Sequence, residues 1–422
     1  MQANEGGDTI TIATGTSLQG STVNGNQGND TITVNAIAAF TNSTLFGGDG
    51  NDSINAINAT VGILGRGDAG NDSIRGGLGN DNLTGGDGND DIRGGDGNDT
   101  INGDDGNDTI FANQGNDLIS GGTGNDVIQA GQGDDSVNGG SGNDTLDGGT
   151  TGNDWLNGEA GDDTITGQAG ADTLTGNAGV DRFNVDAGID TLTDVGNGGA
   201  DDVVISAGAT ANGTVTVDWI ATAITTNAGL ATFTSNAAGI DINLALATGA
   251  NGYSIVGSTG AEILVGSAQA DTITGANGAD ALDGGAGVDS FVQADGSSVI
   301  WTAQTGVVGN VIVAGGVFTF GNSTDVITNF AAGAGGDGIN VTTANNLTTL
   351  AANAATNALT LTNNYLVRGA WNAGARTFTQ ANAGADALIL FNAQNAAFEN
   401  AGNDNFIIAT GVGATLVAAN FT

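Results

Sequence analysis

The chain has 422 residues and a formal net charge of −40, with 46 acidic residues, 6 basic ones, no histidine and no cysteine. These absences exclude thiolate and histidine metal sites and any Ser-His-Asp triad, because each needs side chains that the chain lacks. Negative charge on this scale also argues against nucleic acid or an anionic membrane as a partner. A pair of carboxylates, as in glycosidases, is the one catalytic chemistry left open. We expect no enzyme, since a repeat accounts for nearly every aspartate.

The first segment, residues 1–65, begins without the basic stretch and apolar core of a cleavable signal peptide. No part of the chain approaches the roughly 18 apolar residues of a membrane-spanning helix, so no transmembrane segment is expected. Asp8, Asp30 and Asp52 each precede a short alternating strand at spacings of 22 residues, and Asp72 follows after 20. The pattern predicts a β-helix of wide coils, with aspartate turns at one edge and loops such as residues 36–40 closing the other.

Between residues 66 and 184 the chain repeats a nine-residue unit thirteen times. The unit has the form G-G-x-G-x-D-x-U-x, in which U is a large apolar residue, as in GGLGNDNLT at 76–84 and GGDGNDDIR at 85–93. One inserted residue, Thr150 or Thr151, shifts the frame before it resumes. The aspartates of the units are Asp72, Asp81, Asp90, Asp99, Asp108, Asp117, Asp126, Asp135, Asp144, Asp154, Asp163, Asp172 and Asp181.

The residue types of the unit have physical reasons. Glycine permits a sharp turn in which backbone carbonyls approach a cation. Aspartate adds a hard carboxylate oxygen, which suits Ca²⁺ better than a softer metal. The last three residues are expected to form a short strand with U pointing inward, because side chains alternate between the two faces of a strand. The U positions run from Ile74 through Leu83 to Phe183.

Two units form one coil of eighteen residues, and successive coils are expected to stack about 4.8 Å apart into two parallel sheets. The aspartates then form two ladders, one through Asp72 and Asp90 that continues back to Asp52, the other through Asp81 and Asp99. Carboxylates about 5 Å apart repel by roughly 1 kcal/mol in water and by more at lower dielectric. We therefore expect the metal-free roll to be disordered and Ca²⁺ to fold it by bridging successive coils. The sequence Gly-Asn-Asp, which recurs in most units, predicts asparagine ladders as well.

The repeat stops at Asn184, and residues 185–256 are expected to form a cap and a β-rich linker. Strands with aspartate turns at 189–195 and 200–205 would seal the open edge of the roll. Residues 206–256 are interpreted as antiparallel strands or further wide coils.

Residues 257–292 form a short second roll of weaker units, in which one or two firm metal sites are expected. Its metal-binding positions are Glu262, Asp271, Asp280 and Asp289. Residues 293–422 follow as a second cap and a C-terminal β domain, in which 365–368 and 377–379 are expected to pair as a hairpin.

The nonapeptide resembles the calcium-binding repeat of RTX (repeats-in-toxin) proteins, most closely over residues 66–184 and 257–292. The resemblance implies an all-β fold: a parallel β-roll or β-helix solenoid with Ca²⁺-binding turns, followed by a β-rich cap and a C-terminal β domain. It implies several Ca²⁺ ions, and a secreted protein at the cell surface or outside the cell. RTX proteins use an uncleaved C-terminal signal for type I secretion. The apolar tail at 405–422 is similar to such a signal and is equally compatible with a terminal β-hairpin.

No lipase, protease or pore-forming motif is visible, so we expect a structural protein that self-assembles on binding Ca²⁺, as a surface-layer or filament subunit. Its composition is similar to that of bacterial and cyanobacterial surface-layer proteins. The alternative is a calcium-dependent adhesin or glycan-binding surface protein. The expected partners are other copies of the chain or a cell-surface glycan. Candidates for exposed sugar platforms, for which packing in a core or interface is the commoner role, are Trp155, Trp219, Trp301 and Trp371.

Overall fold

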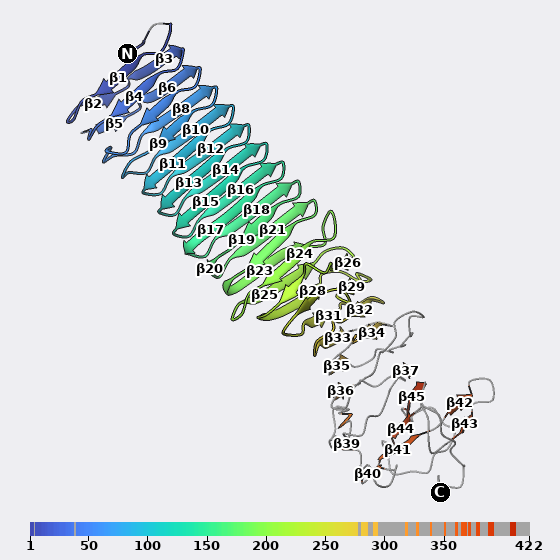
Figure 1. The fold of residues 1–422 in the computed structure, drawn as a ribbon. Coiled ribbons are helices and arrows are strands. Elements are labelled where there is room, and N and C mark those ends of the chain that lie inside the picture. Colours follow the sequence, from blue (N-terminus) through green and yellow to red (C-terminus); the bar gives the residue numbers. More distant parts are fainter. Residues whose placement is uncertain are drawn as a thin grey trace. The chain divides into compact units, whose positions relative to one another are not determined.

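The fold is a parallel β-solenoid, as the repeat predicts (Figure 1). The computed structural model describes residues 1–3, 5–37, 39–276, 280–285 and 290–293, and beyond them the backbone of the short strands from β36 onward. The chain divides into two units, residues 1–213 and 214–422. Throughout these described parts the secondary structure is strands and turns, with no helix, and therefore with none that is long and apolar enough to cross a membrane.

In the first unit each coil contributes one strand to each of two parallel sheets. Sheet A consists of β3 (Thr22–Gln27), β6 (Thr44–Asp49), β8 (Leu64–Ala69), β10 (Asn82–Asp87), β12 (Thr100–Asp105), β14 (Leu118–Thr123), β16 (Ser136–Ser141), β18 (Trp155–Ala160), β21 (Thr173–Ala178) and β23 (Ala187–Val195). Sheet B consists of β1 (Thr9–Ile12), β4 (Thr31–Val34), β7 (Ser53–Asn55), β9 (Ser73–Arg75), β11 (Asp91–Asp96), β13 (Thr109–Gln114), β15 (Val127–Gln132), β17 (Thr145–Thr151), β19 (Thr164–Thr166), β22 (Arg182–Val185) and β24 (Asp202–Ile205). The short β20 (Ala169–Gly170) pairs with β23, and β25 (Thr210–Val215) spans the division between the units.

The strands of the repeat are longer than the expected three residues. Most span six, because the first three positions of the following loop also pair with the next coil. In β10 and β12, for example, Leu83 faces Ile101, and Asp87 still faces Asp105. The loop glycines are therefore part of the sheet, so the metal-binding turns are held in register by backbone hydrogen bonds.

The N-terminal segment forms wide coils whose aspartate turns lie along one edge, as expected. Neighbouring strands of sheet B are offset by 22 residues between β1, β4 and β7 and by 20 between β7 and β9. The other edge is not closed by loops alone. The extra residues of two coils form a further parallel pair of strands, β2 (Ser17–Gln19) with β5 (Ala39–Thr41).

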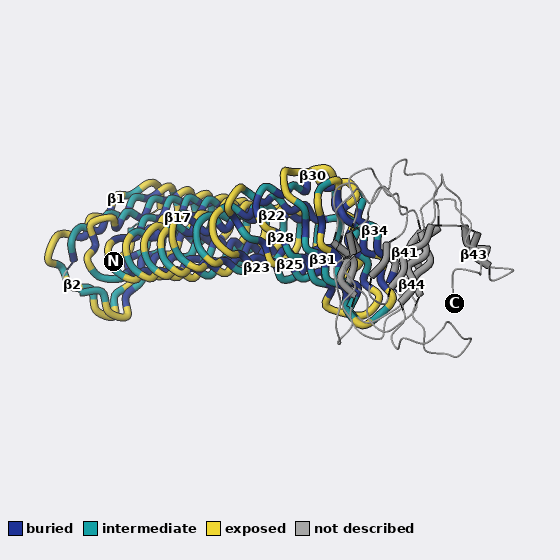
Figure 2. Tube along the Cα trace, turned by 90° about the horizontal axis from the view of Figure 1, so that it is seen from below, coloured by how far each residue is buried: buried dark blue, intermediate teal, exposed yellow. Residues whose placement is uncertain are grey.

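The core is a file of large apolar side chains between the two sheets. Figure 2 shows in dark blue the buried positions that recur from coil to coil. All the U positions from Ile74 to Phe183 point inward and are at most 1% exposed. Each stacks on its equivalent one coil away, as Ile74, Ile92 and Ile110 do. Most strands of the repeat bury only one such side chain between the sheets, so the apolar contribution of each of these coils is modest.

Residues 185–205 do not seal the end of the roll, which corrects the expected cap. Thr191 on β23 pairs with Thr173 on β21, and Asp202 on β24 pairs with Arg182 on β22, both in parallel. The segment continues both sheets because its aspartate turns keep nearly the same spacing as the repeat, and Asp190 lies 18 residues after Asp172.

The second unit also contains parallel wide coils, so the antiparallel interpretation of residues 206–256 was wrong. Its coil strands are β26 (Trp219–Ile220), β27 (Thr226–Asn227), β28 (Leu230–Ser235), β29 (Ile242–Asn243), β30 (Thr248–Gly249), β31 (Ser254–Val256), β32 (Ile263–Val265), β33 (Thr272–Ala276), β34 (Ala281–Asp283), β35 (Ser290–Gln293) and β36 (Val317–Thr319). Their neighbours pair in parallel. Trp219, Phe233 and Tyr253 form the core there, with ring centroids 4.8 and 6.0 Å apart.

The remaining strands form small, mostly antiparallel sheets. They are β37 (Val326–Thr328), β38 (Gly338–Ile339), β39 (Leu350–Ala351), β40 (Leu359–Leu361), β41 (Asn364–Arg368), β42 (Ala370–Asn372), β43 (Thr377–Thr379), β44 (Ala387–Phe391) and β45 (Phe406–Thr410). The expected hairpin is not formed: β41 pairs with β44, and β43 pairs with β42.

The stacked core predicts the effect of truncating one U side chain. Ile101→Ala removes a side chain that is 1% exposed between two coils, and we expect it to lower the free energy of unfolding in excess calcium by about 2–5 kcal/mol. Thr100→Ala, on the exposed face of the same strand, should change it by less than about 0.5 kcal/mol. Urea unfolding followed by far-UV circular dichroism measures both. Equal effects of the two variants would contradict the assigned core.

Candidate metal sites

The repeated aspartates line the two edges of the solenoid. Edge 1 comprises the loops that lead from sheet A to sheet B, and edge 2 comprises those that lead from sheet B to sheet A. In both ladders the Oδ1 atom accepts the backbone N–H of the equivalent residue one coil earlier, at 2.6–3.1 Å. Edge 1 runs from Asp8 through Asp90 to Asp201, and edge 2 from Asp81 to Asp190. The two predicted ladders are therefore present in the predicted register.

The second carboxylate oxygen, Oδ2, differs from Oδ1, because in most of the ladder aspartates it has no hydrogen-bond partner. The residues whose buried Oδ2 lacks a hydrogen bond within the described first unit are Asp30, Asp52, Asp72, Asp90, Asp99, Asp108, Asp117, Asp126, Asp135, Asp144, Asp154, Asp163, Asp172, Asp181 and Asp190. Each of these side chains is at most 4% exposed. A buried carboxylate oxygen without a hydrogen-bond partner costs free energy, so each of these aspartates requires a cation or a proton.

The first loop glycine leaves the space into which this oxygen points. A Cβ placed on Gly85 would collide with Asp90 Oδ2 and with the carbonyl oxygen of Gly103, the first glycine of the next loop on the same edge. The same two kinds of oxygen surround Gly103 and Gly121. The glycine thus keeps open a cradle lined by one carboxylate and by a backbone carbonyl from the adjacent coil.

The backbone of the second loop residue distinguishes the open loops of the repeat from the closed one. In every loop from Asp30 to Asp181 except that of Asp81, this residue has a left-handed backbone, including the non-glycine residues Asn26, Asp68, Asp104, Asn113, Glu159, Gln168 and Asn177. Such a backbone is costly for residues other than glycine, although less so for Asn and Asp. At Asp81 the second residue, Gly77, is not left-handed, and its N–H donates to Asp81 Oδ2 at 2.7 Å. The left-handed residue therefore belongs to the loop form that leaves Oδ2 free.

This donor set fits a hard cation. Within the described residues no three acidic side chains gather to hold a metal, so an ion at an open loop would be held by a carboxylate oxygen and backbone carbonyls. Oxygen-only, carbonyl-rich coordination suits Ca²⁺, which accepts six to eight oxygens in flexible geometry. In the loops of Gly85, Gly103 and Gly121 a carbonyl oxygen of the adjacent coil lies beside the carboxylate, as such coordination requires.

Asparagine ladders run beside the aspartates on the exposed side of each loop. Asn71 Oδ1 accepts the N–H of Asn89, and Asn89 Oδ1 accepts that of Asn107, at 3.0 and 2.8 Å. Edge 2 has an equivalent series that begins at Asn80 and Asn98. These bonds point to the following coil, whereas the aspartates bind the preceding one, so each coil is tied in both directions. The predicted asparagine ladders are thereby confirmed.

The short second roll offers less to a metal than the sequence predicted. Both carboxylate oxygens of Asp271 are used, by the N–H of Tyr253 and by the N–H and hydroxyl of Ser267. Glu262 accepts hydrogen bonds from Gly239, Gly260 and Ser258, and these hold its pKa below the ordinary value although burial alone would raise it. Both loops are therefore closed in the manner of Asp81.

Asp280 continues the ladder, because its Oδ1 accepts the N–H of Glu262 at 3.1 Å. Ala276, the second residue of its loop, has a left-handed backbone with a φ of 62°. Asp289 lies outside the described residues.

Asp30 and Asp190 were absent from the predicted site. Asp30 has the same open loop as the repeat, and GNQGND at 25–30 lacks only the second glycine. Asp190 is recognisable only by its spacing of 18 from Asp172, since Val185 and Asp186 replace the two glycines of its loop.

The model of the RTX calcium-binding nonapeptide repeat matches residues 21–36, 40–56, 66–92, 84–119, 120–150, 148–183, 160–192 and 256–291. This is an RTX repeat protein. The nonapeptides are known calcium-binding motifs, and the match includes the wide coils that carry Asp30 and Asp52. No curated protein matches the chain in a sequence comparison.

Burial shifts the titration of the ladder carboxyls in this RTX protein. Burial, together with the smaller effect of the carboxylate one coil away, raises the pKa of Asp72, Asp108 and Asp144 from 3.8 to about 7. The hydrogen bond from the preceding coil lowers the pKa, but by less than burial raises it. Without a metal, the folded roll therefore takes up protons in place of cations near neutral pH.

The raised pKa values predict a pH dependence with a definite sign. Between pH 3.8 and about 7 the metal-free folded roll binds more protons than the unfolded chain, so it gains stability as the pH falls through this window. Calcium binding to the folded roll must displace those protons, but the protonated folded roll also adds to the folded population, so the calcium concentration at half-folding should be lower at about pH 6 than at about pH 8. Calcium titrations followed by far-UV circular dichroism test this. A midpoint independent of pH would contradict the burial of the ladder.

The cradle predicts opposite effects for two single-methyl changes. Most first positions are glycine, but Ala112 and Ala130 occupy them in the loops of Asp117 and Asp135, and both are 0% exposed. Gly103→Ala fills the cradle of Asp108 and should raise the midpoint, the calcium concentration at half-saturation. Ala112→Gly opens the cradle of Asp117 and should lower this midpoint. Isothermal titration calorimetry measures both. A midpoint that moves in the same direction in both variants would count against the cradle.

Proposed function

We propose that this RTX repeat protein is a secreted structural subunit that calcium folds and that then assembles with other copies, and that it has no catalytic role. The observation that carries the proposal is the distribution of open loops: they follow one another along both edges of the first unit. A sensor or an enzyme needs its ions at one point, whereas ions in every coil serve to build and stiffen the whole element.

Secretion is proposed from the family and from the calcium chemistry. RTX repeat proteins are typically exported by the type I route and act outside the cell. Extracellular calcium modules bind at about 10⁻⁴–10⁻³ M, which keeps them empty in the cytosol and filled outside. The cost of burying so many carboxylates is consistent with folding that waits for this higher concentration.

A second candidate function, a glycan-binding adhesin, is favoured by one side chain. Trp155 is 43% exposed on the outer face of β18, whereas Trp219 is buried in the second unit. Trp301 and the side chain of Trp371 lie outside the described part. An exposed indole on a flat sheet is a suitable platform for the apolar face of a sugar ring. Loss of glycan-array binding on Trp155→Ala would support this candidate.

Electron microscopy of the intact protein distinguishes the two functions. In negative stain with millimolar calcium we expect ordered sheets or filaments, which should disperse when a chelator removes the ions that fix the coils. Magnesium at the same concentration is the matched control, since it resists carbonyl-rich coordination. Single dispersed rods in saturating calcium would refute the structural proposal and favour the adhesin.

A further inference from the structure

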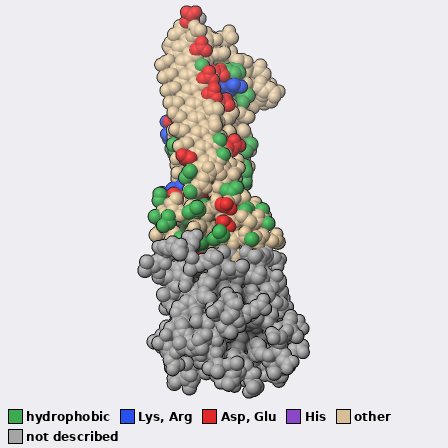
Figure 3. All heavy atoms as spheres, turned by 90° about the vertical axis from the view of Figure 1, so that its right-hand side faces the viewer, with side chains coloured by type: hydrophobic (Ala, Val, Ile, Leu, Met, Phe, Trp, Pro, Cys, Tyr) green, Lys and Arg blue, Asp and Glu red, His purple; other side chains and the backbone are tan. Residues whose placement is uncertain are grey.

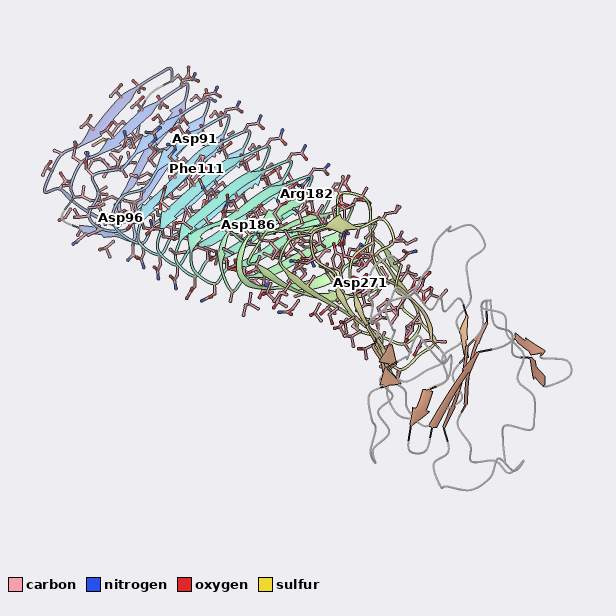
Figure 4. All side chains as sticks on the ribbon, turned by 60° about the horizontal axis from the view of Figure 1, so that its bottom comes forward. Asp91, Asp96, Phe111, Arg182, Asp186 and Asp271 are labelled. Atoms are coloured by element: carbon pink, nitrogen blue, oxygen red, sulfur yellow. The ribbon has the colours of Figure 1, made fainter. Side chains whose placement is uncertain are left out.

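A column of two arginines and a phenylalanine stands out on the outer face of sheet B. Arg75, Arg93 and Phe111 occupy equivalent positions on β9, β11 and β13. The Arg93 guanidinium lies 5.1 Å from the centroid of the Phe111 ring, and its Nε lies 3.1 Å from Asp91 Oδ1. In Figure 4 Asp91 and Phe111 lie close together on the roll. Within the described chain Arg75 has no ion pair or side-chain hydrogen bond.

This arrangement is unfavourable for an isolated molecule. Like charges directly opposite each other on neighbouring strands destabilise a sheet. Only six basic residues occur in the entire chain, and Arg75 and Arg93 are stacked in adjacent coils although 46 acidic residues are available as partners. The column is therefore suited to an anionic partner that reaches both guanidinium groups together.

The same coils carry the complementary pair on the other sheet. Asp87 and Asp105 end β10 and β12, face each other in register and are exposed. Among the described residues neither forms an ion pair, and Asp105 only accepts a hydrogen bond from the Thr123 hydroxyl at 3.0 Å. Figure 3 shows acidic side chains gathered on one face of the N-terminal part of the roll.

The arginine pair and the aspartate pair have opposite charges and the same spacing. Each pair spans one coil, so its members are separated by the same strand spacing of about 4.8 Å. We infer that Arg75 and Arg93 of one copy bind Asp87 and Asp105 of a second copy, so that calcium-loaded rolls associate side by side. This inference rests on the proposed self-assembly and names its contact surface.

The placement of the pairs determines the kind of assembly. The arginines lie on sheet B and the aspartates on sheet A, so the contact joins two different surfaces and leaves one of each free on every pair of copies. Such a heterologous contact does not close by two-fold symmetry and repeats as an open row. Both pairs lie in the same coils, so neighbouring rolls would align at the same level.

A second copy fits the column better than a long anionic polymer does. A polymer running along sheet B would also pass Asp91 and Asp147, which belong to the same face. The Asp87 and Asp105 pair presents two carboxylates at the required spacing and no more. Calcium assists in two ways: it offsets part of the net charge of −40, and it fixes the coil spacing on which the match depends.

Charge reversal followed by mixing tests the inference on the full-length, calcium-loaded protein. The double variants Arg75→Glu/Arg93→Glu and Asp87→Arg/Asp105→Arg should each weaken side-by-side association about tenfold, as expected for two surface ion pairs. An equimolar mixture should restore it, because each variant then supplies the charge that the other lacks. Sedimentation velocity and negative-stain microscopy measure association, and circular dichroism in calcium verifies that each variant folds.

A matched variant distinguishes this contact from a general effect of charge. Arg182→Glu changes the charge of another exposed arginine on sheet B by the same amount as Arg75→Glu, and it should leave association unchanged. Normal assembly of both double variants, or a mixture that fails to recover, would overturn the contact while leaving the proposed function intact. Alginate serves as an anionic polymer probe. If Arg75→Glu/Arg93→Glu loses alginate binding while its self-association is unaltered, the arginine column is assigned to a polyanion instead. Wild-type protein that stays monomeric in calcium would refute both proposals.

Discussion

The structure depends on a carboxylate oxygen that is buried and has no protein partner. In the open loops one oxygen of the ladder aspartate accepts an N–H from the preceding coil, and the other has no hydrogen-bond partner and points into the space beside the first loop glycine. Backbone pairing and one apolar side chain per strand are small contributions against the repeated cost of such groups. A cation in each open loop converts that cost into a bond between coils. We therefore expect folding and ion binding to be one equilibrium in this chain.

The closed loops show what the chain does when no ion is needed. At Asp81 and Asp271 the second loop residue donates its N–H to Oδ2, and the carboxylate is satisfied internally. The Asp81 loop carries the full GGLGND signature, so its composition alone does not explain the difference. The segment one coil earlier explains it. The N–H of Leu78 donates to the carbonyl of Ala59, and Ile63 occupies the position that an aspartate holds in the repeat. The closed form of the Asp81 loop therefore follows from the wide coil on which it stacks, whereas the Asp99 loop, which stacks on the Asp81 loop, is open.

The same reasoning explains how far the sequence predicts this molecule. The nine-residue period predicted both sheets, the two ladders and the inward U side chains, because each follows from spacing and local chemistry alone. The closed state of Asp81, the satisfied carboxylate of Glu262 and the continuation of the roll past Asn184 depend on contacts 18 to 23 residues away. Such contacts are set by the neighbouring coil, and the residues of the loop itself carry little sign of them.

The polarity of the ladders connects the metal sites to the outer surface. Aspartate side chains bind the coil before them and asparagine side chains the coil after them, so every coil is positioned by both neighbours. An ion held between coils thus fixes the spacing of whole rows of outward side chains, including Arg75 and Arg93 on one sheet. A partner that recognises two charges one coil apart can bind only after the interior is filled. In the proposed assembly calcium would therefore control association without any ion at the contact itself, because it would determine whether the spacing exists.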